Sequence, residues 1–98
     1  MSGKLVRDKI PRIIESKGQV ASTRILNQEE YVFELLAKLS EEVEEFKQDK
    51  NREELADILE VLEAIYNYYG FKAEEIAAIK KQKLEERGGF KDRIYLLK

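Results

Sequence analysis

The chain contains no cysteine, no histidine and no tryptophan, and a single proline among its 98 residues. Without cysteine, disulfides, thiolate metal sites and cysteine nucleophiles are excluded. Without histidine, catalytic triads, imidazole zinc sites and histidine general bases are excluded as well. Any bound metal must therefore be held by oxygen atoms, which favours Mg²⁺, or Mn²⁺, over zinc.

Long apolar runs are also missing. No segment approaches the roughly 18 consecutive apolar residues of a membrane span, and the start, MSGKLVRDKIP, lacks the apolar stretch of a signal peptide. We therefore expect a soluble, cytoplasmic protein with no membrane partner. The length suits one domain, 1–98, and a domain this small buries more apolar surface when a second subunit packs on it.

Charged residues are abundant, at 39% of the chain against about 25% in average domains, and they are unevenly distributed. Residues 1–26 carry six Lys/Arg and two acids, residues 41–63 carry ten acids and three bases, and residues 72–98 carry eight bases and five acids. An acidic centre between basic ends suits a cation and a polyphosphate bound together. Charge alone fits solvated helix faces equally well. The acidic centre argues against a nucleic acid polymer as partner.

Apolar spacing predicts two long helices, at about 28–48 and 52–69, joined by a few polar residues into an antiparallel hairpin. Asn27 and Asn51 each stand three residues before a glutamate, which is a helix start signal. Gly70 closes the second helix. The predicted inner stripes are Val32, Leu35, Leu36, Leu39, Val43 and Phe46 in the first helix, and Leu55, Ile58, Leu59, Leu62, Tyr66 and Tyr69 in the second.

The second helix carries further apolar residues, Val61, Ala64 and Tyr68, outside that stripe. A helix that is apolar beyond one stripe packs on two sides, which favours a partner subunit. We predict another helix over 73–87, whose core side is Ile76, Ile79 and Leu84, and a short helix before Gly18. The predicted fold is all-α with short extended end segments, among them a short strand at 94–97.

Two carboxylate pairs stand at helical i,i+3 spacing, Glu42 with Glu45 and Glu54 with Asp57. Helical geometry places each pair at the edge of its predicted stripe, so an antiparallel hairpin can bring the four side chains together near the turn. Four crowded carboxylates repel one another, and a divalent cation is their natural counterion. Spacing alone does not decide which acids converge, because others share these helices: Glu41, Glu44, Glu53, Glu60 and Glu63.

The segments EEVEE at 41–45 and ELAD at 54–57 resemble the EExxE and ExxD motifs of the all-α NTP pyrophosphohydrolase superfamily, which includes MazG-like and phosphoribosyl-ATP pyrophosphohydrolase-like proteins. The flanks KLVRDKIP, EELADILEVLEAI and KKQKLEERGGFKDRIYL resemble a small housekeeping branch of it. The resemblance covers nearly the whole chain. The motifs here are separated by only eight residues, 46–53, which is shorter than in many relatives and implies a tighter site.

This resemblance implies that Glu42, Glu45, Glu54 and Asp57 bind Mg²⁺, with Glu41 assisting catalysis by orienting the attacking water. It implies a MazG-like helical bundle completed by oligomerisation, as a homodimer or homotetramer. The implied reaction cleaves a nucleoside triphosphate, canonical or not, to the monophosphate and pyrophosphate. Two alternatives stay open: a helical oligomer that binds nucleotide without turnover, and one that is purely structural.

Phosphate groups call for cations, and the resemblance places a KxxxR pair near the phosphates in relatives. Here that pair is Lys83 and Arg87, at i,i+4 on one helix face, which we expect to lie off that helix's apolar stripe. Arg7 and Lys9, in the basic amino-terminal segment, are the second candidates for binding substrate. For each of these residues the alternative is an ordinary exposed cation.

Overall fold

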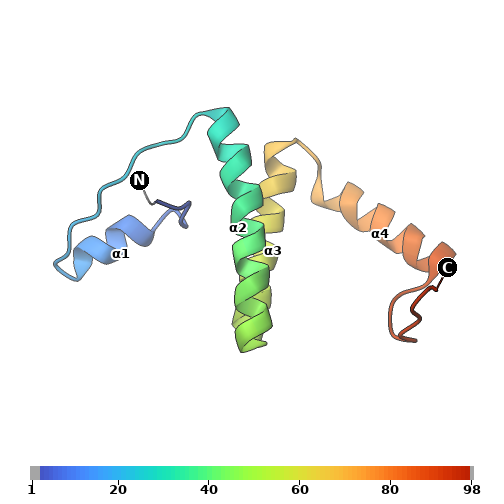
Figure 1. Cartoon of the computed structure of the whole chain (residues 1–98). Helices are drawn as coiled ribbons and strands as arrows, with labels where there is room; N and C mark the ends of the chain where they lie inside the picture. The colour runs from blue at the N-terminus through green and yellow to red at the C-terminus, as the bar shows by residue number, and fades with distance from the viewer. Residues whose placement is uncertain (1–2, 98) are drawn as a thin grey trace.

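The computed structural model describes residues 3–97, and these residues are helical wherever they form regular structure. Four helices follow one another along the chain (Figure 1): α1 Ile10–Ser16, α2 Gln28–Asp49, α3 Arg52–Tyr68 and α4 Ala73–Arg87. The predicted helices at 28–48, 52–69 and 73–87 are confirmed to within one residue. The predicted strand at 94–97 is wrong: that segment has no strand partner among residues 3–97.

Both predicted start signals cap a helix. The Asn27 side chain accepts a hydrogen bond from the Glu30 backbone N–H at 2.9 Å, and the Glu30 carboxylate accepts one from the Asn27 N–H at 3.0 Å. The Asn51 side chain accepts from the Glu54 N–H at 2.9 Å. Lys50 ends α2 in the left-handed conformation, with φ 49°. The chain therefore reverses within two residues, and α3 runs back along α2 (Figure 1).

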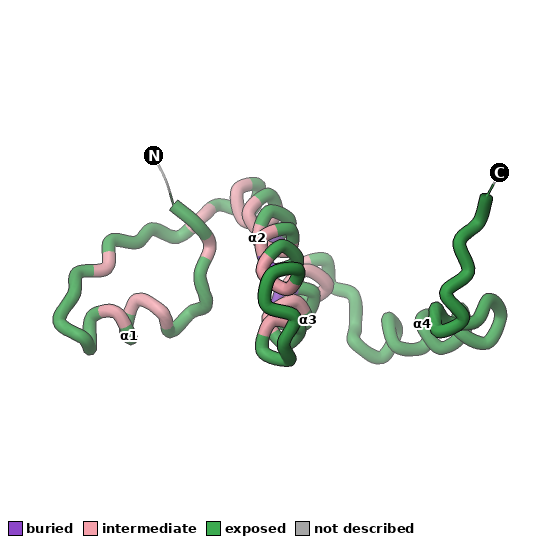
Figure 2. Tube along the Cα trace, turned by 60° about the horizontal axis from the view of Figure 1, so that its bottom comes forward, coloured by how far each residue is buried: buried purple, intermediate pink, exposed green. Residues whose placement is uncertain are grey.

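Among residues 3–97, the most buried residues lie where α2 packs against α3 (Figure 2). Leu35 of α2 is 4% exposed, and Val61 of α3 is 9% exposed. Ala64 and Tyr68 are half-buried on the same side as Val61. The predicted inner stripe of α3 is therefore wrong for most of its residues, which are exposed, namely Leu55, Leu59, Leu62 and Tyr69.

The packed face of α2 is also rotated from the predicted one. Leu36 and Val43, which were assigned to the inner stripe, are exposed, whereas Glu42 is buried. Taking 100° per residue, Glu42 lies only about 20° from Leu35 around the helix, while Leu36 lies about 100° away. The centre of the helix interface is thus polar at the level of Glu42, and both helices keep an apolar face uncovered.

The α4 helix and the tail that follows it lie away from the hairpin (Figures 1 and 2). Every described residue from 69 to 97 is exposed, including the apolar Ile76, Ile79 and Leu84. The radius of gyration is 17.4 Å, against about 13 Å for a compact domain of this length. Within residues 3–97, no helix combines the length and the apolar character that crossing a membrane requires.

Candidate metal centre

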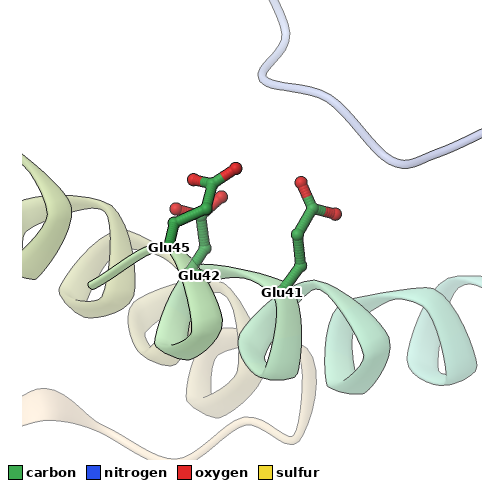
Figure 3. A group of neighbouring side chains, drawn as sticks. All are labelled: Glu41, Glu42 and Glu45. Atoms are coloured by element: carbon green, nitrogen blue, oxygen red, sulfur yellow. The ribbon is translucent and has the colours of Figure 1, made fainter. Parts of the chain in front are cut away.

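Five carboxylates converge where α2 and α3 face each other near the turn, and together they form the acidic cluster: Glu41, Glu42, Glu45, Glu54 and Asp57. They make two groups of three that share Glu42, and in each group one oxygen from every residue lies within 4.8 Å of the others. Figure 3 shows the three α2 members rising from one side of the helix, with the carboxyl groups of Glu42 and Glu45 next to each other. The two predicted pairs thus share one place in the fold.

Helix periodicity explains why the cluster is partly inside the protein. Glu42 follows Leu35 by seven residues, or about two turns, and Asp57 precedes Val61 by one turn, so both acids lie in line with buried apolar residues. Glu42 is only 5% exposed, and Glu54 and Asp57 are half-buried. The expectation that both pairs stand at the edges of the packed faces is therefore corrected for Glu42, which lies within the interface, whereas the half-buried Glu54 and Asp57 suit edge positions.

Two carboxylate oxygens of the cluster lack a hydrogen-bond partner among the described residues. They are Glu42 Oε2 and Glu54 Oε2, and both are inaccessible to solvent. A buried polar atom without a partner costs about 1–3 kcal/mol, and more when it is charged. The protein therefore holds two negative groups in an unfavourable position that a cation would relieve.

The pKa values follow the same pattern. Burial raises the pKa of Glu42 above its usual range, and the charges of Glu45 and Asp57 raise it further, against the opposing effect of Lys38. Burial raises the pKa of Glu54 as well, together with the charges of Glu45 and Asp57. Each shift means that the ionised carboxylate is disfavoured here by burial and by its negatively charged neighbours.

Lys38 is a member of the site that the sequence reasoning missed. Its ammonium group lies 3.1 Å from Glu41 Oε1 and 3.4 Å from Glu42 Oε1, and its side chain is only 17% exposed. Burial works against ionisation of Glu41, but Lys38 and Lys4 outweigh it and lower the pKa of Glu41. The spacing of Lys38 before Glu41 and Glu42, at i,i+3 and i,i+4, is the sequence signal that could have found it.

The amino-terminal segment crosses the cluster as a strap of residues 4–9. Arg7 donates a hydrogen bond to Asp57 Oδ1 at 2.6 Å, and Lys4 lies 3.4 Å from Glu41 Oε1. The strap thus reaches one acid from each helix, from 37 and 50 residues away in the chain. Arg7, a candidate for binding substrate, stands beside the acids, and nothing in the spacing of the sequence indicated the Lys4 contact.

The candidate pair Lys83 and Arg87 is not brought to the acidic cluster within one chain. Both residues are exposed on α4, which runs away from the hairpin (Figure 1). Their predicted position off the apolar stripe is also wrong, because Lys83 and Arg87 each lie about 20° from Ile76 around the helix, on either side of it. The apolar and the cationic side chains of α4 therefore share a face.

The donor set fits a hard divalent cation. All its ligands are carboxylate oxygens from two facing helices, which is the chemistry that Mg²⁺ and Mn²⁺ prefer, and the two orphaned oxygens of Glu42 and Glu54 are available for it. Acidic groups at helical spacing are common on protein surfaces, but a Glu that is 5% exposed is not an ordinary surface acid. No family model, curated protein or solved structure matches the chain.

Proposed function

We propose that the protein is a Mg²⁺-dependent nucleotide pyrophosphohydrolase with a MazG-like arrangement, which cleaves a nucleoside triphosphate to the monophosphate and pyrophosphate. The observation that carries the proposal is the pair of buried, unpartnered oxygens of Glu42 and Glu54 inside a cluster of converging carboxylates. A protein that used these acids only for solubility would expose them to water.

Glu42, Glu45, Glu54 and Asp57 would hold the ion. When bound, Mg²⁺ neutralises phosphate charge and lowers the pKa of a nearby water. The two helices supply these ligands from rigid elements, and the short turn at Lys50 fixes their relative height. Mn²⁺ has similar ligand preferences and is expected to substitute.

Residues of the protein supply the other functions of catalysis, namely orienting the water, accepting its proton and binding the phosphates. Glu41 stays ionised at neutral pH, since Lys38 and Lys4 move its pKa further below the ordinary value, and it can orient a water and accept its proton. The water oxygen bonds to the α-phosphorus, the bond from that phosphorus to the bridging oxygen breaks, and the bridging oxygen leaves with pyrophosphate. Arg7 and Lys38 pair with acids of the cluster, and Lys9 lies two residues after Arg7 in the strap. These cations would bind phosphate oxygens, and such positioning supplies most of the catalysis in phosphoryl transfer.

The proposal includes a homo-oligomer, a dimer or a tetramer. The accessible surface of one chain is 9312 Å², whereas a compact protein of 11.5 kDa exposes about 5,800 Å². The surplus is roughly 3,500 Å² per chain, so covering it in a dimer would bury about 7,000 Å² in total, which is at or above the upper end of obligate interfaces. Lys83 and Arg87, which do not reach the cluster of their own chain, would then stand near the site of another copy.

Pyrophosphate release over a panel of canonical and non-canonical nucleoside triphosphates tests the proposal. We expect release with Mg²⁺ or Mn²⁺ and none with a chelator. Binding of nucleotide without release would favour a non-catalytic nucleotide-binding protein instead. If Mg²⁺ also failed to raise the melting temperature, the acids would not form a cation site, and a purely structural oligomer would remain.

A further inference from the structure

A groove of about 410 Å³ lies between the strap and the hairpin, beside the acidic cluster. Residues 5–9 of the strap form one side of it, and residues of α2 and α3 form the other. Glu42 and Asp57 belong both to the groove and to the cluster. The volume falls in the range of about 300–1,000 Å³ that is typical of small-molecule sites.

The charges of the groove select what it can bind. Its cations are Arg7, Lys9 and Lys38, and its carboxylates are Asp8, Glu42, Asp57 and Glu60. With one more negative than positive group, the groove by itself does not attract a polyanion. A divalent cation held by Glu42 and Asp57 reverses that balance, so the groove suits a metal–nucleotide complex better than free nucleotide.

The rest of the lining is apolar. Leu5, Leu35, Val61 and Ala64 face the groove together with the ring of Tyr31. Phosphate groups gain nothing from such a surface, whereas a nucleobase and the apolar side of a sugar do. A nucleotide can place its phosphates at the acidic cluster and its apolar part against these residues. Each part of the ligand then contacts a surface of matching chemistry.

We infer that this groove is the seat of the nucleoside, with the strap as one wall and α2–α3 as the other. The inference rests on the proposed function, and it adds the part of the molecule that selects the nucleoside. The strap contacts the acidic cluster through the ion pairs of Arg7 with Asp57 and of Lys4 with Glu41. The wall that contacts the nucleoside is therefore attached to the same acids that would hold the metal.

A matched pair of substitutions on α3 tests the assignment. Ala64→Leu adds three carbons at a half-buried position that lines the groove, whereas Ala56→Leu adds them at an exposed position that does not. Both changes suit a helix. We expect Ala64→Leu to raise KM for the nucleoside triphosphate about tenfold or more, and Ala56→Leu to leave it unchanged. Equal KM values in the two variants, both folded by circular dichroism, would overturn the inference.

Amide chemical shifts separate a failure of the groove from a failure of the proposed function. With Mg²⁺ present, a nucleoside monophosphate should shift residues 5–9, Tyr31 and Ala64 of the full-length protein, and pyrophosphate should shift mainly the acidic cluster. Shifts in the groove without any turnover would leave the groove assignment standing and refute the hydrolase. Turnover, with chemical shifts from the nucleoside monophosphate confined to residues outside the groove, would support the hydrolase and refute the groove assignment. If Ala64→Leu changed only the oligomeric state, the groove would be a contact between copies, and the inference would fail.

Discussion

The α2–α3 hairpin and the α4 arm, residues 73–97, form their helices equally well and pack very differently. Both regions have amphipathic or mixed sequences with clear start and stop signals, and both lie within one residue of their predicted bounds. Yet Leu35, Glu42 and Val61 are buried in the hairpin, whereas every described residue of the arm is exposed. Local signals therefore decide where helices begin and end, and only tertiary partners decide which faces are covered.

Each of the two regions leaves an apolar surface uncovered in one chain. In the hairpin, one side of each helix packs against the other helix, and Leu55, Leu59 and Leu62 of α3 stay exposed. In the α4 arm, no described apolar residue is buried. In the proposed homo-oligomer, these two uncovered apolar surfaces of a chain with a radius of gyration of 17.4 Å would form the contacts between copies.

The largest expected effect concerns the uncovered face of α3. Leu59 is 65% exposed in one chain, so Leu59→Glu would be harmless in a monomer. If a second copy covers this residue, the substitution buries a charge and loses about 1.5–3 kcal/mol of apolar burial per subunit. We expect sedimentation to show wild type as an oligomer and Leu59→Glu as monomer.

Asn67→Glu, at an exposed polar position of the same helix, should leave the assembly intact. A wild type that sediments at 11.5 kDa would contradict the account.

A smaller effect is expected from the cations of the arm. Lys83→Ala and Arg87→Ala should each weaken nucleotide binding by about 1.5–3 kcal/mol, the cost of losing a hydrogen bond to a charged group. Both residues are exposed in one chain, so the fold of the chain should be unaffected. The measurement is KM for the preferred triphosphate. An unchanged KM in both variants would return Lys83 and Arg87 to the role of ordinary surface cations.

The smallest effect compares the third residues of α2 and α3, which are both glutamates. Glu30 closes a capping box with Asn27, whereas Glu54 leaves one oxygen buried without a partner. Glu30→Ala should therefore lower the free energy of unfolding by about 0.5–1 kcal/mol. Glu54→Ala should not lower it in metal-free protein, because it removes an unfavourably buried carboxylate. Urea unfolding with a chelator present measures both, and an equal loss in the two variants would show that Glu54 is an ordinary capping residue.

Sequence reasoning predicted the helices and the convergence of the carboxylates, because both depend on spacing within about one turn. It assigned the wrong face of α3 to the hairpin interface, since that helix is apolar on two sides and periodicity alone cannot rank them. It missed Lys4, whose contact with Glu41 spans 37 residues of chain and leaves no local pattern. The direction of α4 could not be predicted either, because every residue of this helix is exposed and its apolar spacing therefore does not report a packing partner.

The central claim is that the acidic cluster holds a catalytic divalent cation. Its most direct test compares wild type with Glu45→Gln and Asp57→Asn, and with Glu63→Gln as a control on an exposed acid, in a pyrophosphate-release assay with Mg²⁺. The amide keeps the shape of the side chain and removes the charge that binds a hard cation. We predict loss of activity in the first two variants and full activity in the control. We also predict that the metal-free Glu45→Gln and Asp57→Asn proteins are at least as stable as wild type but gain nothing from added Mg²⁺. Full activity in both variants would contradict the claim.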